Sequence, residues 1–454
     1  MRAHDANQLG ALIDARRTRV CVLGLGYVGL PLLGAVVAAG FPAMGLDHDR
    51  EKIEKLKRGE NYLPHLGQEL ASSLATNANV LLTHDPSELR GADAVLICVP
   101  TPLDEQHQPD LGAVERAAAE IRKFAIDVQP QRPRLVVLES TTYPGTTREL
   151  LGGILAGGPG RSGDAANSPA SLFLAFSPER EDPGNPRFST RTIPKLVGGV
   201  DPESSELARR LYSQVVEKVV VVSSAEVAEA AKLVENIYRA VNIALVNELK
   251  IVLDAMGLDI WEVLDAAATK PFGFQRFNPG PGFGGHCVPV DPFYLAWKAR
   301  QCGQQTAFVE LAGEINRRMP VWVVDRVERT LSEAGRSLNG ARVLVLGLAY
   351  KPDIADVRES PSFELVELLR GRGANVTYHD PYVPRTWRGR RHDLRMESVP
   401  WSAEVLAAQD AVLIGTDHAW YDWAFVARHA RLIVDTRGAM RRVGVNGPGR
   451  IVTA

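Results

Sequence analysis

The residue whose type and setting most favour chemistry is Cys287, which stands in a loop of glycines and prolines over residues 278–292. Glycines let a backbone approach a ligand closely and prolines fix its path, so such a loop is costly to order and buries little apolar surface. A cysteine that only fills a core would be expected in an apolar run, as Cys21 and Cys98 are. The sequence therefore predicts a reactive thiol at Cys287.

A carboxylate follows this thiol after four residues. Asp291 and Pro292 open a run with helical character, and Asp is a good N-cap while Pro favours the first helical position. One interpretation of Asp291 is therefore a helix cap alone. The second is that the same carboxylate also holds a water or a hydroxyl group beside Cys287, whose thiolate form the helix N-terminus would favour. The two roles are compatible.

A second pair of polar residues, Lys232 and Asn236, shares one face of a long amphipathic helix predicted between residues 223 and 257. On a solvated surface such a pair has no role. Lys232, however, stands in the apolar sector beside Ala230 and Ala231, which favours a function. A helix of this length suits a spine that joins two domains and carries a dimer seam.

A glycine turn near the N-terminus marks a dinucleotide site. The apolar strand 20–23 ends at the turn 24–29, a helical pattern follows, and the next strand ends in Asp47, 18 residues after the third glycine. An acid at that position accepts from both ribose hydroxyls and favours NAD over NADP. The residues expected to contact NAD here are Gly24, Gly26, Tyr27, Val28, Gly29 and Asp47.

Polar turns close the later strands of the same domain. Strands 94–99 and 135–138 lead into Thr101 and into the run Ser140 to Thr142, and strand 172–176 leads to Glu179. Ligands lie at the carboxyl ends of strands in doubly wound sheets, so these residues are candidates for the cofactor cleft. The alternative is that the threonines only serve the turns.

The repeating pattern of strands and helices predicts an α/β protein with two Rossmann-like parallel-sheet domains, joined by a central helical domain with a long spine helix. The expected boundaries are 1–218, 219–330 and 331–454. The last domain begins with strand 341–346 and lacks a GxGxxG turn. Its Lys351 and Arg358 lie in a strand-end loop and suit phosphate contacts, although solvated surface charge remains an alternative.

Composition excludes several classes of protein. The 454 residues carry 52 basic and 54 acidic side chains, so no general attraction for nucleic acid or anionic membrane is expected. There is no apolar run of ~18 residues and no signal-peptide pattern, which indicates a cytoplasmic protein. The four cysteines lack metal-ligand spacing, so we expect reduced thiols and no metal site.

Over nearly its whole length the sequence resembles the UDP-glucose/GDP-mannose dehydrogenase family. The matching segments are Gly-Leu-Gly-Tyr-Val-Gly-Leu at 24–30, Val-Pro-Thr-Pro at 99–102, Glu-Ser-Thr-Thr at 139–142, Ser-Pro-Glu-Arg at 177–180, Lys232 with Asn236, Gly-Phe-Gly-Gly-His-Cys-Val-Pro-Val-Asp at 282–291, and Lys-Pro-Asp with Arg-Glu-Ser at 351–360. The resemblance implies a four-electron oxidation of a sugar C6 alcohol to a carboxylate with two NAD molecules in turn.

The resemblance also gives the polar residues roles that their chemistry fits. The thiolate of Cys287 captures the aldehyde as a thiohemiacetal, which a second oxidation converts to a thioester. Lys232 stabilises the developing oxyanion and Asn236 supplies a hydrogen bond. Asp291 positions a water with Lys232 or Thr142, and Glu179 is the general base for thioester hydrolysis. A second glutamate that the UDP-glucose enzymes carry four residues after Glu179 is Pro183 here, so no role is transferred to it.

Substrate and remaining cofactor contacts follow in the same way. Thr101, Thr141 and Arg358 are expected to contact NAD, and the nucleotide-sugar contacts expected are Arg276, Phe277, Gly284, Gly285, His286 and Lys351. His286 stands where UDP-glucose enzymes have a serine, and in this the sequence resembles the UDP-N-acetylhexosamine branch of the family. Segments 269–274 and 292–299 look most like UDP-N-acetylglucosamine 6-dehydrogenases of bacterial surface-polysaccharide pathways.

Several alternatives remain open at this point. The manno and galacto epimers of the N-acetylated sugar, and UDP-glucose, are alternative substrates. A β-hydroxyacid dehydrogenase would need neither Cys287 nor the last domain, and a nucleotide-sugar sensor would lack the set of Cys287, Lys232 and Asp291. A homodimer or a higher homo-oligomer is expected.

Overall fold

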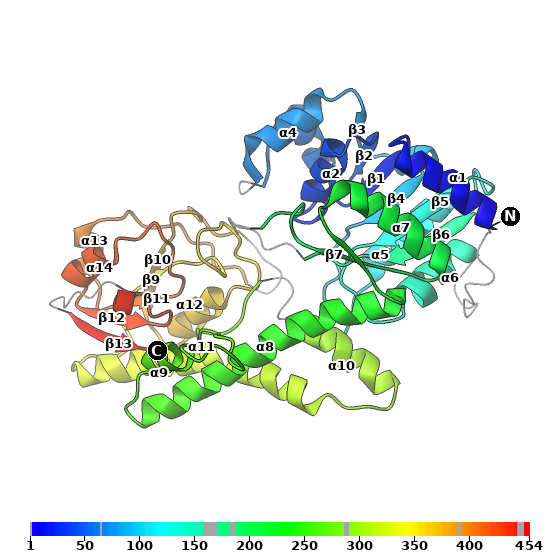
Figure 1. The fold of residues 1–454 in the computed structure, drawn as a ribbon. Coiled ribbons are helices and arrows are strands. Elements are labelled where there is room, and N and C mark those ends of the chain that lie inside the picture. Colours follow the sequence, from blue (N-terminus) through cyan, green and yellow to red (C-terminus); the bar gives the residue numbers. More distant parts are fainter. Residues whose placement is uncertain are drawn as a thin grey trace. The chain divides into compact units, whose positions relative to one another are not determined.

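The computed structural model describes residues 2–63, 66–104, 106, 108–157, 171–180, 188–285, 290–387, 392–442 and 449–454. The chain forms two compact units (Figure 1). Unit 1 comprises residues 1–235 and 293–304, and unit 2 comprises residues 236–292 and 305–454. In the described part of the chain, no helix has the length and apolar character needed to cross a membrane.

Unit 1 is built on an eight-stranded sheet with the order β3-β2-β1-β4-β5-β6-β7-β8. Its strands are β1 (Val20–Leu23), β2 (Ala43–Leu46), β3 (Val80–Thr83), β4 (Ala94–Ile97), β5 (Arg134–Leu138), β6 (Leu172–Phe176), β7 (Lys195–Gly199) and β8 (Val219–Val221). The central strands are buried along their whole length, as expected where helices cover both faces of a parallel sheet. One pairing departs from the parallel pattern, because β6 and β7 run antiparallel.

The helices of unit 1 follow the strands closely in sequence. They are α1 (Arg2–Asp14), α2 (Gly29–Ala38), α3 (Arg50–Lys57), α4 (Gly67–Thr76), α5 (Gly112–Ile121), α6 (Gly152–Ala156) and α7 (Pro202–Val215). Helix α1 packs on the core of unit 1. Leu9 and Ile13, one helical turn apart, are buried in the core of unit 1, and Arg2 forms an ion pair with Asp201 at the start of α7.

Unit 2 contains a five-stranded parallel sheet with the order β10-β9-β11-β12-β13. Its strands are β9 (Arg342–Leu346), β10 (Asn375–His379), β11 (Ala411–Ile414), β12 (Leu432–Asp435) and β13 (Arg450–Thr453). The helices outside unit 1 are α9 (Ile260–Ala267), α11 (Ala307–Glu333), α12 (Pro361–Gly371), α13 (Ala403–Ala407) and α14 (Trp423–His429). Helices α8 (Ala225–Ala255) and α10 (Asp291–Gln301) contain residues of both units. The predicted α/β class with two sheets and a long helix is confirmed.

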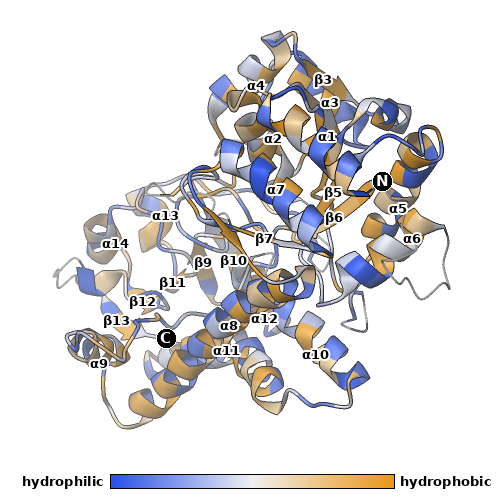
Figure 2. Ribbon diagram, turned by 45° about the vertical axis from the view of Figure 1, so that its right-hand side comes forward, coloured by the Kyte–Doolittle hydropathy of each residue, from blue (hydrophilic) through white to orange (hydrophobic). Residues whose placement is uncertain are grey.

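Helix α8 exposes an apolar stripe. Tyr238, Leu245, Leu249 and Val252 are spaced by seven, four and three residues, so they lie on one face. Between 39% and 49% of each side chain is exposed. Apolar residues in orange recur along this helix in Figure 2. A surface of this kind marks an interaction site more often than a solvated helix face.

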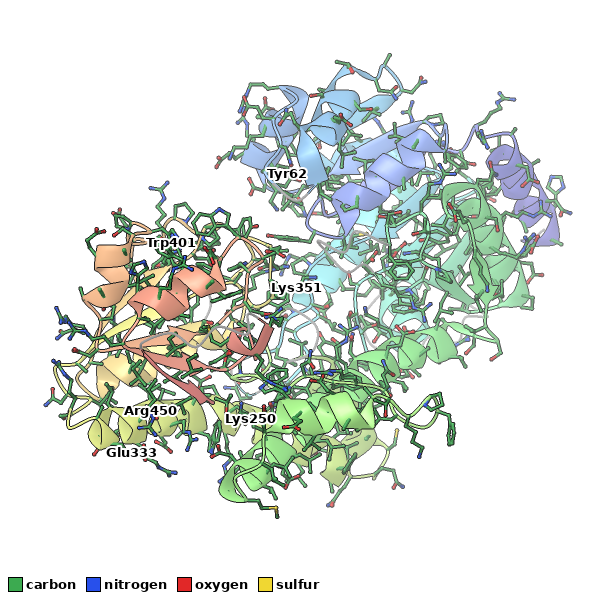
Figure 3. The ribbon with its side chains drawn as sticks, turned by 60° about the vertical axis from the view of Figure 1, so that its left-hand side comes forward. Tyr62, Lys250, Glu333, Lys351, Trp401 and Arg450 are labelled. Atoms are coloured by element: carbon green, nitrogen blue, oxygen red, sulfur yellow. The ribbon has the colours of Figure 1, made fainter. Side chains whose placement is uncertain are left out.

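Lys250 lies on the other side of α8, in the interior of unit 2. It is 2% exposed, and its ammonium lies 6.0 Å from the ring of Trp261 and 5.7 Å from that of Trp322. Within the described residues its Nζ has no hydrogen-bond partner. Burial lowers the pKa of Lys250 to about 8 from an ordinary value of 10.5, because the interior disfavours the charged form. Figure 3 labels Lys250. The same figure labels Glu333 and Arg450, whose ion pair of 2.7 Å joins α11 to β13 elsewhere in unit 2.

We expect Lys250→Met to stabilise the protein at neutral pH. The folded pKa of about 8 lies below the unfolded value of 10.5, so the buried ammonium destabilises the folded state most below pH 8. The shift corresponds to about 3 kcal/mol of unfolding free energy at pH 7, less the lost contacts with the tryptophan rings. This gain should shrink as the pH rises from 8 to 10.5. Denaturation of both proteins at pH 7 and pH 10 measures it, with the exposed Lys57→Met as control; lower stability than wild type at pH 7 would contradict the assignment.

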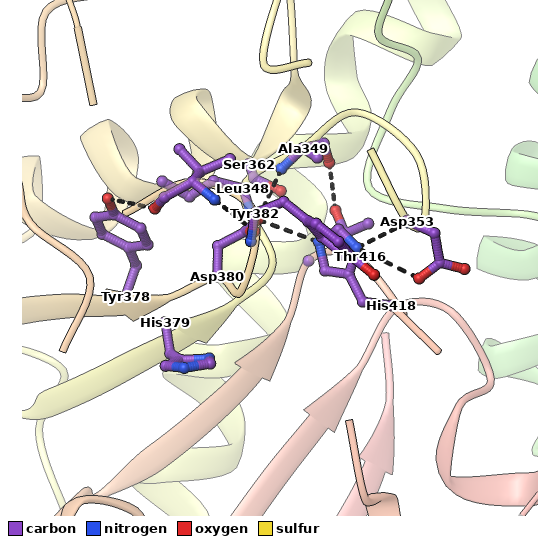
Figure 4. Close-up of polar contacts among 12 residues, drawn as sticks. Leu348, Ala349, Asp353, Ser362, Tyr378, His379, Asp380, Tyr382, Thr416 and His418 are labelled. Atoms are coloured by element: carbon purple, nitrogen blue, oxygen red, sulfur yellow. Dashed lines mark hydrogen bonds and ion pairs between the residues drawn. The ribbon is translucent and has the colours of Figure 1, made fainter. Parts of the chain in front are cut away.

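The carboxyl end of the second sheet is organised around Asp380 (Figure 4). This fully buried carboxylate accepts hydrogen bonds from the backbone N–H groups of Leu348 (2.7 Å) and Ala349 (3.2 Å) and from Nε2 of His418 (3.1 Å). Burial alone would raise the pKa of Asp380, but these donors outweigh it and hold the pKa below its usual value. Asp380 therefore fixes the turn after β9, which has no GxGxxG sequence.

Candidate active site

The glycine turn after β1 has the geometry of a dinucleotide loop. Gly24 has φ +94°, and a Cβ there would lie 2.7 Å from the carbonyl oxygen of Cys98. A Cβ at Gly29 would lie 1.8 Å from the carbonyl oxygen of Gly24. Gly26 faces open space, with nothing within 4 Å of an added Cβ. Gly24 and Gly29 thus pack the turn together, while Gly26 leaves its surface open to a ligand.

Asp47, which follows β2, is bound to this turn. Its Oδ2 accepts from the N–H of Leu25 at 2.8 Å and its Oδ1 from the N–H of Asp49 at 2.9 Å. The ammonium of Lys52 is a third donor, 3.5 Å from Oδ2. A carboxylate has about four acceptor positions, so Asp47 keeps capacity for one ribose hydroxyl. Tyr62, labelled in Figure 3, donates its hydroxyl to the carbonyl oxygen of Leu25 at 2.5 Å and supports the same turn. These residues fit NAD.

We expect Asp47→Ala to weaken NAD binding by about 10- to 100-fold, the value of one or two charge-assisted hydrogen bonds. Titration calorimetry with NAD measures the change directly. Asp49→Ala is the matched control, because Asp49 caps α3 through the N–H groups of Glu51 and Lys52 and has no expected ribose contact. Equal affinities of wild type and Asp47→Ala would refute the contact.

The threonines at the strand ends differ in their surroundings. Thr101 is buried, and its carbonyl oxygen accepts a hydrogen bond of 3.1 Å from the hydroxyl of Tyr294. Ser140 ties the end of β5 to β4 by donating its hydroxyl to the carbonyl oxygen of Val99 at 2.7 Å. Thr141 is half-buried, whereas Thr142 is fully buried, and among the described residues its hydroxyl has no hydrogen-bond partner.

Lys232 and Glu179 lie together in unit 1. Lys232 is 8% exposed, and its ammonium donates a hydrogen bond to the backbone carbonyl oxygen of Glu179. The burial expected for Lys232 from its apolar sector is therefore observed. The Glu179 side chain is 13% exposed, and its Oε2 lies 3.8 Å from Nζ of Lys195. Lys232 therefore binds the backbone of Glu179, and Lys195 lies beside its carboxylate.

Sequence reasoning missed a buried polar cluster beside Glu179. Glu139 directly follows β5, and both of its oxygens are engaged: Lys195 forms an ion pair with it and the hydroxyl of Tyr212 donates to it. Burial lowers the pKa of Lys195, but the carboxylates of Glu139 and Glu179 outweigh this and hold it above its usual value. A lysine as first residue of an otherwise apolar strand was the available signal.

Glu229 is a second residue that the sequence did not single out. It is fully buried on α8, and its carboxylate accepts from the N–H of Gly145 at 2.6 Å and from the N–H and hydroxyl of Thr147 at 2.8 and 2.7 Å. Burial raises the pKa of Glu229 to about 7. Because this carboxylate holds the start of the π-helical turn Thr146–Leu151, it fixes the loop that carries Thr141 and Thr142.

In unit 2, Asn236 and Asp291 are in direct contact. The amide of Asn236 donates to Oδ2 of Asp291 at 2.5 Å, and the two side chains are 4% and 1% exposed. Asp291 is the first residue of α10 and Pro292 the second. The sequence predicts Asp291 as the cap just before the helix, so the two assignments differ by one position. His286 and Cys287 lie outside the described residues.

The described part of the loop before Cys287 is anchored to unit 2. The N–H of Gly280 donates to the side chain of Asn247 at 2.9 Å, and a Cβ on Gly280 would lie 2.7 Å from the half-buried side chain of Arg437. The N–H of Gly285 donates to the carbonyl oxygen of Arg358 at 3.2 Å, and a Cβ on Gly284 would lie 2.8 Å from Tyr350. Close packing against the loop after β9 therefore already requires Gly284. Arg437 was not expected here.

Of the remaining candidates for substrate or cofactor contact, Arg276 and Arg358 have polar partners. Arg276 pairs with Asp265 and its Nε donates to Asn278 at 3.0 Å. The Phe277 ring packs edge-on against that of Tyr238 with centroids 5.7 Å apart. Arg358 pairs with Asp356 at 2.6 Å, and Lys351, labelled in Figure 3, is half-buried in the same loop. Tyr27 and Val28 are half-buried in the glycine turn.

The fold, the glycine turn and Asp47 define an NAD-binding protein of the dehydrogenase class. The chain belongs to the UDP-glucose/GDP-mannose dehydrogenase family, because sequence models of its three domains match in order. The NAD binding domain matches residues 18–216, the central domain 226–318 and the UDP binding domain 344–442. The predicted family, the enzyme class and the use of NAD are confirmed.

Similar proteins carry names from the N-acetylated branch. The chain is 34% identical over 366 residues to a UDP-N-acetyl-D-glucosamine 6-dehydrogenase of Pseudomonas aeruginosa, covering 80% of this chain and 83% of that protein. It is 32% identical to a UDP-N-acetyl-D-mannosamine dehydrogenase of Pyrococcus horikoshii, covering 93% and 96%. A solved structure of UDP-D-ManNAc dehydrogenase from Pyrococcus horikoshii aligns with TM-score 0.79 at 31% identity, covering 96% and 99%.

Proposed function

We propose that this protein oxidises the C6 hydroxyl of a UDP-N-acetylhexosamine, UDP-N-acetylglucosamine first among them, to the uronic acid for surface-polysaccharide precursors. The family's UDP binding domain and the names of the relatives support a nucleotide-sugar substrate. His286 supports the N-acetylated branch, and the relatives named for UDP-N-acetyl-D-mannosamine make the manno epimer the second candidate. Use of NAD favours the cytoplasm.

The observation that carries the proposal is the contact between Asn236 and Asp291. Asp291 lies four residues after Cys287, and its buried carboxylate accepts a hydrogen bond of 2.5 Å from the buried amide of Asn236. Helix formation alone does not require this contact. A buried carboxylate needs donors, and Asn236 supplies one of them. We infer that this contact orients the Asp291 carboxylate for the role that the family assignment implies, which is to position a water or a substrate hydroxyl.

The chain's own residues then perform the chemistry. When bound, NAD accepts hydride from C6 in each of two oxidations, and it would be held by Gly26, Asp47, Tyr27, Val28, Thr101, Thr141 and Arg358 with the packed Gly24 and Gly29. The thiolate of Cys287 adds to the aldehyde carbon to form a thiohemiacetal, and loss of the second hydride leaves a thioester. Lys232 stabilises the negative charge on the substrate oxygen, with Asn236 as hydrogen-bond donor.

Hydrolysis completes the reaction. Glu179 takes a proton from water, the resulting hydroxide adds to the thioester carbonyl, and the carbon–sulfur bond breaks to release the acid and the Cys287 thiolate. Asp291 positions a water together with Lys232 or Thr142. For Thr142, whose hydroxyl is fully buried, this role needs the surrounding loop to open. The residues assigned to the nucleotide-sugar are Arg276, Phe277, Gly284, Gly285, His286 and Lys351.

A panel of nucleotide sugars tests the substrate. Initial rates of NADH formation are measured with UDP-N-acetylglucosamine, its manno and galacto epimers, UDP-glucose and GDP-mannose. The proposal predicts the highest kcat/KM for UDP-N-acetylglucosamine and at least a tenfold preference for N-acetylated sugars over UDP-glucose. A preference for UDP-glucose or GDP-mannose would contradict the assignment of the branch.

We further propose that the exposed stripe of α8 is the interface of a homodimer. Its four apolar residues continue a helix face across about four turns, and a second copy of the same stripe would cover them. Leu245→Asp with Leu249→Asp should convert the dimer to a monomer. Light scattering during size-exclusion chromatography measures the mass, and Leu258→Asp, exposed beyond the end of the helix, is the control. A dimeric double variant would contradict this interface.

A further inference from the structure

Lys195 is a buried cation that the proposed mechanism does not use. It is the first residue of β7, and its side chain is 6% exposed. Its ammonium lies between two carboxylates, forming an ion pair with Glu139 and lying 3.8 Å from Oε2 of Glu179. One of these carboxylates belongs to the residue assigned as general base.

The rest of the cluster anchors Lys195 from the interior. The Glu139 carboxylate is fully buried and also accepts a hydrogen bond from the hydroxyl of Tyr212, which is itself fully buried on α7. A buried ion pair repays little of the free energy needed to remove two charges from water, so it is weak support for a purely stabilising role. Such an arrangement suits a function that requires a fixed charge.

The surroundings of Glu179 agree with that function. A small pocket of ≈ 10 Å³, about the space of one water molecule, is lined by Glu179, Arg180, Thr190, Ile193, Pro194 and Lys195. Lys232 holds the backbone of the same residue through the carbonyl oxygen of Glu179. The backbone and the carboxylate of Glu179 are thus each held by a lysine, and polar groups border a space of the size that hydrolysis requires.

We propose that Lys195, anchored by Glu139 and Tyr212, is a positioning residue that holds the Glu179 carboxylate in place for thioester hydrolysis. The proposal rests on the proposed function of Glu179. Lys195 does not touch the reacting atoms; it acts through the carboxylate. Without it, the carboxylate would lose the ammonium that lies 3.8 Å from its Oε2, so hydrolysis would slow while the first hydride transfer would not.

The test separates the first hydride transfer from hydrolysis of the thioester. Lys195→Met combined with Glu139→Gln removes the cation without leaving an unpaired buried charge, so this double variant is expected to fold. Rapid mixing with NAD and UDP-N-acetylglucosamine should give a first NADH phase within about twofold of wild type. Steady-state turnover should fall by about 10- to 100-fold, and intact-protein mass spectrometry should show the thioester adduct on the enzyme.

Two further variants keep the result interpretable. Tyr212→Phe retains every charge and loses one hydroxyl that anchors Glu139, so it should accumulate a smaller fraction of thioester. Lys195→Arg, which keeps the cation, should restore most of the turnover that Lys195→Met loses. An equal loss in the first NADH phase and in steady-state turnover would overturn the proposal. Unchanged turnover and no thioester adduct, in both the double variant and Tyr212→Phe, would overturn it as well. If Glu179→Gln itself accumulates no thioester, it is the proposed function that fails.

Discussion

Replacing Cys287 with serine is expected to abolish formation of the uronic acid, with a loss of at least about 10³-fold in acid produced per enzyme. A serine hydroxyl at neutral pH is a far weaker nucleophile than a thiolate, and without the thioester the second oxidation has no covalent intermediate. The product is measured by mass spectrometry after incubation with NAD and UDP-N-acetylglucosamine, beside a count of NADH formed.

The matched control is Cys302→Ser, because Cys302 is an exposed thiol outside the predicted site. This control should retain wild-type acid formation. Cys287→Ser that still yields two NADH per sugar at a comparable rate would contradict the covalent mechanism. Loss of activity in both variants would mean that the effect of replacing a cysteine with serine is not specific to Cys287.

Replacing Glu179 with glutamine is expected to stop the reaction after the second oxidation. An amide cannot take a proton from water, so the thioester on Cys287 should persist and turnover should fall by about 10²- to 10⁴-fold, the range of general base catalysis. Rapid quenching followed by intact-protein mass spectrometry detects the uronyl adduct. A burst of NADH, equivalent to two per active site, should precede the slow phase.

Glu149→Gln provides the control for this experiment, since Glu149 is a carboxylate of the same unit with a side chain 63% exposed. It should turn over normally and carry no adduct. If Glu179→Gln loses activity without an adduct at any quench time, Glu179 acts before the thioester forms and is not its hydrolytic base.

The dinucleotide half of the site could be predicted because its determinants are local in sequence. The positive φ of Gly24 and the contact of Asp47 with the N–H of Leu25 both arise within one strand–turn–helix–strand segment. The long helix was likewise predicted within two residues at each end, since its apolar periodicity extends over eight turns. The burial of Lys232 followed from the same pattern.

The buried cluster could not be predicted in this way. Glu139, Lys195 and Tyr212 come from β5, β7 and α7, and they meet only because β7 joins the sheet beside β6 in antiparallel orientation. In the sequence, Lys195 is marked only as the first residue of an otherwise apolar strand, a position where surface lysines also occur. The packing of Gly284 against Tyr350 has the same origin, because it depends on a tertiary contact of two distant segments.

The stoichiometry of the reaction tests the central claim most directly. The enzyme is given a limiting amount of UDP-N-acetylglucosamine with excess NAD, and NADH absorbance and the nucleotide-sugar products are measured at completion. Four-electron oxidation through Cys287 predicts two NADH per sugar, the uronic acid as product and no released aldehyde. One NADH per sugar with an aldehyde product, or no NADH with any N-acetylated sugar, would contradict it.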